Sequence, residues 1–160
     1  MQHVMIPTDL SIRSLGYLHH LASQTESPVR ITLMHALRLP DSLLDCWPFS
    51  RSHRYVHVPD DFREACEVMK NRYAQVFSHI GVEFFYGTTA PALRNFVRAH
   101  DIHRIAVPDQ LHYRNAGENS YNPESLFRHM KLPVSSLKMT APRQVVTAPA
   151  SISALLGVQV

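Results

Sequence analysis

The sequence has little cysteine, no long apolar run and no recognisable leader at its first residues. Only Cys46 and Cys66 occur in 160 residues, too few for the disulfide framework on which small secreted domains depend. No apolar stretch approaches the roughly 20 residues that a membrane-spanning helix requires. The first residues, MQHVMIPTDLS, lack the basic region followed by an apolar stretch that a signal peptide would show. We therefore expect a cytoplasmic protein without a membrane partner.

A strong charge of one sign is also missing. The formal net charge is +3. Residues 1–80 contain eight Lys or Arg and eight Asp or Glu, whereas residues 81–160 contain eight and five, so the whole excess falls in the second half. A surplus of this size can attract a phosphate or an acidic ligand. It is too weak and too scattered for a nucleic-acid footprint, and no nucleic-acid-binding motif accompanies it, so we expect no nucleic-acid partner.

The residues that are present have the balance of a globular protein, with 45% hydrophobic and 18% charged. A chain of 160 residues is long enough for one domain with a core. Strand-like apolar runs alternate with helix-like spacing of apolar residues. The predicted strands are residues 3–7, 29–37, 82–86, 102–107 and 134–139, and the predicted helices are 15–22, 62–80, 93–100 and 125–130.

Strands that alternate with helices predict βαβ units with right-handed crossovers and a parallel sheet. The expected fold class is therefore α/β, a three-layer α/β/α sandwich with a five-stranded, doubly wound parallel sheet. We expect residues 1–140 to form this domain. The apolar tail, residues 141–160, is expected to pack on this domain or on a dimer partner. Residues 38–60 are predicted to form a long loop.

Ligands of doubly wound sheets bind at the carboxyl ends of the strands, beside the point where the strand order reverses. The first and fourth predicted strands end at Thr8-Asp9 and at Pro108-Asp109, so function is expected there. Asp9 permits two interpretations. It can cap the first helix, a role worth about 1 kcal/mol, or it can contact a ligand.

Four segments resemble the universal stress proteins in their order and spacing. Residues 4–11, VMIPTDLS, resemble the opening strand and turn of that family, and residues 31–35, ITLMH, resemble its second strand. Residues 87–108 follow its third helix and fourth strand. Residues 126–134, LFRHMKLPV, match its closing helix and its R-H-x-x-x-P-V ending. The resemblance covers roughly residues 1–140 and implies that Asp9 would face an adenine.

Members of that family that bind ATP carry a glycine-rich signature after the fourth strand: Gly, two residues, Gly, nine residues, Gly, then Ser or Thr. In this sequence the corresponding positions hold Pro108, Leu111, Tyr121 and Asn122. Glycine lets a backbone approach phosphate oxygens, whereas proline removes an N–H donor and larger side chains crowd the phosphate position. The loop is interpreted either as one that has lost nucleotide binding or as one that binds a different small anion through His112, Arg114 and Asn115.

The resemblance leads to hypotheses of different classes. The first is a non-catalytic signalling or stress-response homodimer with weak or absent nucleotide binding, joined through its fifth strand, Val134 to Met139, or acting on a protein partner. The second is a protein that binds, or slowly hydrolyses, ATP or AMP through a modified phosphate loop. A regulatory domain for a transporter or a kinase is a third. The missing glycines favour the first, so no cofactor is expected. The candidate binding residues are Thr8, Asp9, Pro108, Asp109, His112, Arg114 and Asn122.

Other residues give weaker signals. The eleven histidines are not accompanied by a coherent cysteine or carboxylate set, so no metal site is expected. No Ser/His/Asp motif or carboxylate pair is recognisable, and no catalytic residue is proposed. Cys66 and His35 are interpreted as core residues, His35 as a hydrogen-bonded one. Arg94 and Arg98 lie one helical turn apart, which suits either a phosphate clamp or a solvated helix face.

Overall fold

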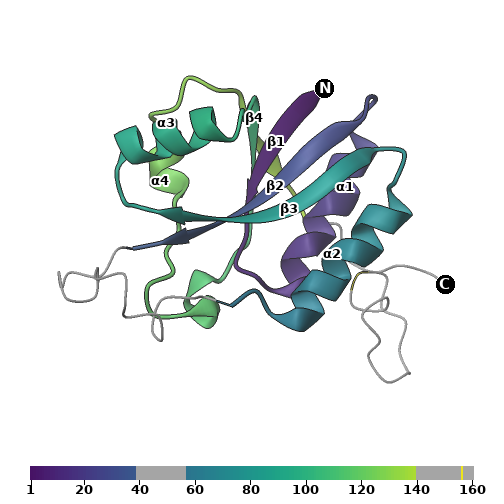
Figure 1. Cartoon of the computed structure of the whole chain (residues 1–160), viewed down its shortest axis with the longest axis horizontal. Helices are drawn as coiled ribbons and strands as arrows, with labels where there is room; N and C mark the ends of the chain where they lie inside the picture. Colours follow the sequence, from purple (N-terminus) through teal and green to yellow (C-terminus); the bar gives the residue numbers. More distant parts are fainter. Residues whose placement is uncertain (39–56, 140–155, 157–160) are drawn as a thin grey trace.

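The computed structural model describes residues 1–38, 57–139 and Leu156, and the structural statements below concern these residues. They form one sheet of five parallel strands in the order β3-β2-β1-β4-β5 (Figure 1). The strands are β1 (Gln2–Pro7), β2 (Val29–Leu37), β3 (Phe77–Tyr86), β4 (Arg104–Pro108) and β5 (Val134–Leu137). The chain winds outward from β1 to β3 and then returns to β4 on the other side of β1. This order confirms the doubly wound α/β fold and places the switch point between β1 and β4.

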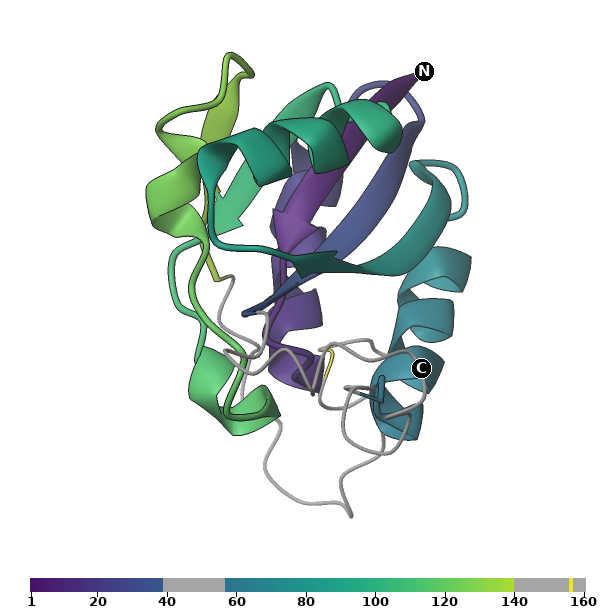
Figure 2. The ribbon, with the colours of Figure 1, turned by 60° about the vertical axis from the view of Figure 1, so that its left-hand side comes forward.

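Helices cover both faces of the sheet, which gives three layers (Figures 1 and 2). One face carries the 3-10 helix η1 (Ile12–Gly16), α1 (Tyr17–Ser23) and α2 (Asp60–Arg72). The other face carries α3 (Ala90–Ala99) and α4 (Glu124–Phe127). A second 3-10 helix, η2 (Tyr113–Ala116), lies in the loop after β4.

The two central strands are buried on both sides, which explains why their sequences read as nearly continuous apolar runs. Because side chains alternate along a strand, each strand contributes to both layers of core. The side toward α1 and α2 buries Val4, Ile6, Ile31 and Leu33. The side toward α3 and α4 buries Met5, Met34 and Ala36.

The predicted helix over residues 62–80 is wrong at its carboxyl end. Helix α2 stops at Arg72, and β3 begins at Phe77 rather than at residue 82. Strand β3 pairs with β2 along its whole length, with a register irregularity between Val29 and Arg30. An irregularity of this kind turns the chain within a strand, and Phe77 and Ile80 both bury their side chains in the core under α2. A spacing of three residues, typical of a helix, thus comes from an irregular strand.

Other element boundaries also differ from the prediction. Ile102 is buried but lies outside β4, and β5 ends at Leu137 instead of Met139. Helix α4 covers residues 124–127 rather than 125–130, and its N-cap is Pro123. Asn122 precedes this cap, and its Oδ1 accepts a hydrogen bond from Glu124 N at 2.9 Å.

Leu156 belongs to the apolar tail that was expected to pack on the domain, and its side chain is only 2% exposed. It joins the core cluster under α1 and α2. The Nε2 of His19 in α1 donates a hydrogen bond to the Leu156 carbonyl, and the His19 Nδ1 lies 2.5 Å from the Tyr73 hydroxyl. The other residues of the tail, like residues 39–56 of the long loop, lie outside the described part.

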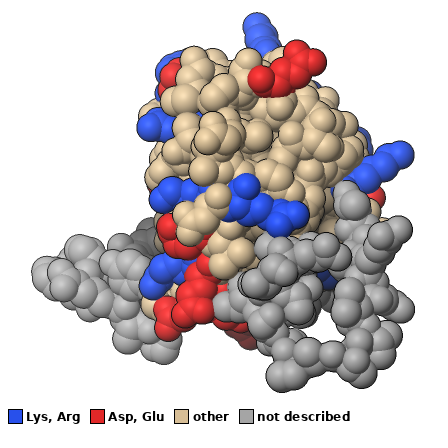
Figure 3. Space-filling model, turned by 90° about the vertical axis from the view of Figure 1, so that its right-hand side faces the viewer, with Lys and Arg blue, Asp and Glu red and all other residues tan. Residues whose placement is uncertain are grey.

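The surface next to α2 mixes both signs of charge. Figure 3 shows Lys and Arg side chains close to Asp and Glu side chains on this side of the molecule, with a broad uncharged area above them. Within the described residues, no helix is long and apolar enough to cross a membrane.

Candidate functional site

The carboxyl end of β1 is fastened by the side chain and backbone of Thr8. Thr8 N donates to Met34 O at 2.9 Å, and Thr8 Oγ1 accepts from Leu10 N at 3.1 Å. The same hydroxyl lies 3.0 Å from Ser14 Oγ. Leu10 has a φ of +60°, a left-handed backbone conformation that residues other than Gly, Asn and Asp seldom adopt. These contacts hold a tight turn that aims Asp9 toward the loop after β4.

The Asp9 carboxylate is buried, and both of its oxygens accept hydrogen bonds from the protein. Asp9 Oδ1 accepts from Ser11 N at 3.0 Å and from Ser11 Oγ at 2.6 Å, and Asp9 Oδ2 accepts from His112 N at 2.9 Å. Ser11, not Asp9, caps the first helical segment, since its side chain accepts from Ser14 N. The helix-cap interpretation of Asp9 is therefore wrong. Asp9 orients the capping serine and ties β1 to a loop more than a hundred residues away.

Beside Asp9, the fully buried His35 links β1, β2 and the same loop. Its Nδ1 lies 2.8 Å from Thr8 O and its Nε2 lies 2.8 Å from Ser120 Oγ. A carbonyl only accepts, so Nδ1 carries the proton and the neutral ring accepts at Nε2 from the serine hydroxyl. Burial lowers the pKa of His35, opposed by the Thr8 carbonyl and the Asp9 charge. His35 is thus the hydrogen-bonded core residue that its place on an apolar strand predicted.

An aromatic ring closes this cluster from the loop side. The Tyr113 ring lies 6.3 Å from the His35 ring, centroid to centroid, and is 7% exposed. Burial raises the pKa of the Tyr113 hydroxyl, and the charges of Asp9 and Glu124 add to this effect. Phe84 of β3 also contacts the histidine, in an edge-on arrangement with centroids 6.0 Å apart.

Residues 109–122 form the loop after β4. Several of its backbone N–H groups donate hydrogen bonds to acceptors within the protein. These pairs are Asp109 N to Leu137 O (3.0 Å), Gln110 N to the Tyr17 hydroxyl (2.9 Å), His112 N to Asp9 Oδ2 (2.9 Å) and Tyr121 N to Ala36 O (3.3 Å). The loop also accepts, since Asn119 O binds Arg38 N at 2.8 Å. Ser120 forms an antiparallel bridge with Leu37. The loop is thereby laid across the ends of β1 and β2.

The end of β4 is tied to α1 through Asp109. The Tyr17 hydroxyl donates to Asp109 Oδ1 at 2.6 Å. Burial and this hydrogen bond raise the pKa of Tyr17 to about 12. Asp109 therefore combines an exposed position with one oxygen already bound to the protein.

Two cavities lie along the loop. The smaller, about 330 Å³, is lined by four of the predicted site residues, Pro108, Asp109, His112 and Asn122. Glu124 also lines it, so its walls bear two carboxylates. The larger, about 520 Å³, is lined by Arg38, His112 and Asn122 together with Tyr121. The Arg38 guanidinium lies over the Tyr121 ring, 5.6 Å from its centroid.

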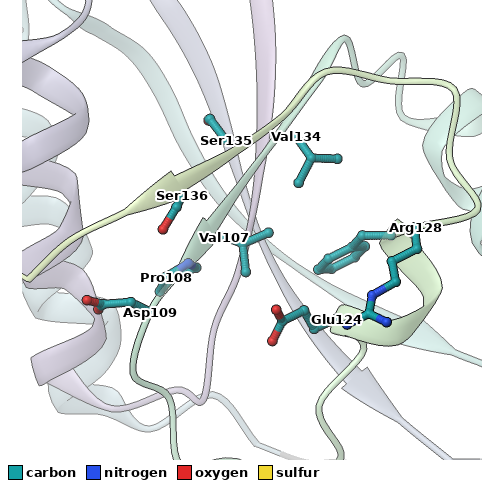
Figure 4. A pocket seen from close by; sticks show the side chains of 9 residues that line it. Val107, Pro108, Asp109, Glu124, Arg128, Val134, Ser135 and Ser136 are labelled. Atoms are coloured by element: carbon teal, nitrogen blue, oxygen red, sulfur yellow. The ribbon is translucent and has the colours of Figure 1, made fainter.

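A third cavity, about 550 Å³, lies beside the edge strand β5. Figure 4 shows Val107 of β4 and Val134 of β5 on one side of it, and Glu124 of α4 and Arg128, which directly follows α4, on the other. It shares Pro108 and Asp109 with the smaller loop cavity. The carboxyl end of β4 therefore separates a loop-lined cavity from one bordered by the sheet edge.

The structure brings together part of the predicted site. Thr8 and Asp9 are buried and line none of these three cavities. The side chains of Arg114 and Asn115 lie outside the described part. Sequence reasoning missed Arg38, Tyr113 and Ser120. Arg38 directly follows a predicted strand, a signal that could have found it, whereas nothing local marks the other two.

In the described ranges, 1–38 and 57–139 with Leu156, no group of three His, Cys, Asp or Glu side chains could hold a metal ion. Cys66 is buried in the core, and burial raises the pKa of its thiol to about 12. A thiol that stays protonated is a poor nucleophile. Cys66 is therefore a core residue, as its position on the apolar face of a helix predicted.

No family model and no curated protein matches the sequence. Solved structures do match. The hypothetical protein PH0823 is 14% identical, with a TM-score of 0.57, over 88% of this chain and 97% of that chain. The hypothetical protein MJ0577 is also 14% identical, with a TM-score of 0.56 and the same coverage. The universal stress protein UspA from Lactobacillus plantarum is 12% identical, with a TM-score of 0.54, over 85% and 97% of the two chains.

Proposed function

We propose that this chain, which has the fold of the universal stress proteins, is a non-catalytic signalling or stress-response protein that acts as a homodimer with weak or absent nucleotide binding. The observation that carries the proposal is the hydrogen bonding of the loop after β4. A loop that cradles phosphates presents free backbone N–H groups to their oxygens. Here the N–H groups of Asp109, Gln110, His112 and Tyr121 are donated to the protein itself.

Three further features support the proposal that nucleotide binding is weak or absent. The Asp9 carboxylate has both oxygens occupied by Ser11 and His112. Tyr113 is buried against His35 at the ends of the central strands. The smaller loop cavity contains Asp109 and Glu124, and like charges repel a polyphosphate. A nucleotide held by the loop backbone would have to displace several internal hydrogen bonds before it made its own.

A nucleotide-binding function is the second candidate, and one observation favours it. The larger loop cavity, about 520 Å³, lies within the range of roughly 300–1,000 Å³ that small-molecule sites occupy. Arg38 and His112 on its wall are groups that can face a phosphate. ATP or AMP would then bind outside the loop instead of within its backbone.

Calorimetric titration of the full chain with ATP, ADP and AMP, with and without magnesium, separates the two candidates. We expect no saturable heat with any nucleotide. Micromolar binding that Arg38→Ala abolishes would replace the first candidate with the second. Arg13→Ala is the matched control, because Arg13 is exposed and lines neither loop cavity.

The homodimer is proposed to form through β5. The strand order places β5 at one edge of the sheet, and Val134 on it is 49% exposed. An unpaired strand edge is a template for another strand. Sedimentation velocity of the wild type should show a dimer, and Val134→Lys or Ser136→Pro should shift it to a monomer. Tyr86→Lys is the control, since Tyr86 is 48% exposed on β3 at the opposite edge. A monomeric wild type, or dissociation by the Tyr86 variant alone, would overturn this part.

A further inference from the structure

A fourth cavity lies at the amino ends of the strands, opposite the loop cavities, which lie at the carboxyl ends. It is found where α3 finishes and β4 and β5 begin. It has a volume of about 260 Å³ and is formed by the last turns of α3, by Asp101 and Ile102, and by residues 130–132. None of its lining residues lines the loop cavities or the cavity beside β5. It therefore belongs to neither the candidate ligand site nor the proposed dimer edge.

The rim of this cavity is cationic. Arg94 and Arg98 come from one face of α3, one turn apart, and Lys131 comes from the turn after α4. All three are exposed. Among the described residues, none of them forms an ion pair. The single acid of the lining, Asp101, lies 3.6 Å from His103 Nε2 through its Oδ1.

The floor of the cavity is apolar. Ile102 is 5% exposed and belongs to the core between the sheet and α3. Val97, Met130 and Leu132 are partly buried against the same core. The volume of about 260 Å³ lies below the usual range of small-molecule sites, roughly 300–1,000 Å³. A floor of this size suits a single apolar side chain better than a nucleotide.

We propose that this surface docks an acidic peptide segment of a protein partner. One apolar side chain of the segment enters the cavity, and Asp or Glu residues before and after it face Arg94, Arg98 and Lys131. The three cations have no acidic partner in the described chain, so charge complementarity selects the occupant. The lining contains no aromatic ring on which a base could stack, which disfavours a nucleic acid.

The test uses a short fluorescein-labelled peptide with one central Leu between runs of Asp and Glu, titrated with the full chain at low salt. We expect saturable binding by fluorescence anisotropy that weakens as salt is raised. The double variant Arg94→Glu/Arg98→Glu and the single variant Lys131→Glu should each bind the peptide roughly ten-fold more weakly or worse, because each removes attraction and adds repulsion. A matched peptide with Ala in place of Leu should also bind roughly ten-fold more weakly.

The control variant is Arg72→Glu, which reverses an exposed cation of α2 on the opposite face of the sheet. It should leave peptide affinity unchanged, and circular dichroism should show all variants folded. No binding by the wild type, equal loss in Arg72→Glu, or indifference to the Leu-to-Ala exchange would each overturn the proposal. So would tighter binding of a single-stranded RNA, or of inorganic phosphate, that the same rim variants abolish.

Discussion

Ser120 and His35, which are 85 residues apart in the chain, are joined by a hydrogen bond of 2.8 Å beneath the loop after β4. The histidine is fully buried and its second ring nitrogen binds the Thr8 carbonyl. The imidazole of His35 therefore connects the end of β1, strand β2 and the loop after β4. This bond, together with the link from Asp9 to His112 N, holds the loop across the carboxyl ends of β1 and β2.

Ser120→Ala tests the first of these fastenings. The substitution leaves the buried His35 Nε2 without its donor, which should lower the free energy of unfolding by about 1–3 kcal/mol. Urea unfolding measures this loss. Amide hydrogen exchange should also speed up at Arg38 and Tyr121, whose N–H groups bond across the loop, but not within β1. Ser125→Ala, an exposed serine of α4, should change neither quantity. Equal stability of both variants would contradict the role given to Ser120.

Stability should fall as the pH is lowered from neutrality through about 6.5. Burial lowers the pKa of His35 below its ordinary value of 6.5, so the unfolded chain takes up a proton before the native chain does. Stability contributed by neutral His35 is therefore present above pH 6.5 and is lost as the pH falls toward the native pKa. One such histidine adds at most about 1.4 kcal/mol per pH unit.

Urea midpoints measured between neutral and mildly acidic pH check this slope. His35→Gln should be less stable at neutral pH but should lose stability less steeply on acidification. His129→Gln, at an exposed position, should retain the wild-type slope. Burial also lowers the pKa of His3, so part of the slope should persist in the His35 variant. An identical slope in wild type and His35→Gln would rule out the proposed linkage.

Asp9→Ala should lower the free energy of unfolding by about 2–4 kcal/mol. The change removes the acceptor of three hydrogen bonds and leaves the N–H of His112 without a partner at a part-buried site. Asp9→Asn keeps one acceptor oxygen and should cost less. Thermal or urea unfolding gives both values, with Glu118→Gln as an exposed control. Wild-type stability of Asp9→Ala would show that the carboxylate is free to serve another purpose.

Leu156→Ala tests whether the end of the chain is part of the core. Leu156 is 2% exposed within the cluster under α1 and α2, and truncation of a buried leucine costs about 2–5 kcal/mol. We expect a loss in this range by urea unfolding. Thr88→Ala, at an exposed position away from the proposed dimer edge, should change stability by less than about 1 kcal/mol. Removal of residues 141–160 with no change in stability would contradict the expectation that the tail packs on the domain.

Several features follow from the sequence alone. The bounds of β2, Val29–Leu37, match the predicted strand. A strand buried on both faces reads as a nearly continuous apolar run, and β2 follows this pattern. The alternation of strands and helices determined the parallel, doubly wound sheet, because parallel strands need crossover connections and those crossovers have one hand. The ends of the first and fourth strands could be located because their apolar runs stop at Thr8-Asp9 and Pro108-Asp109.

Only the tertiary structure decided what happens at those ends. From the sequence, Asp9 can be a cap or a ligand contact, and its partner His112 lies in a loop whose path no local pattern determines. The roles of Ser120 and Tyr113 could not be predicted either, since their contacts with His35 depend on how that loop crosses the sheet. The carboxyl end of the helix predicted over residues 62–80 was decided by pairing of β3 with β2. Local periodicity records which residues are buried, whereas long-range pairing decides which groups bury them and whether a crevice stays open.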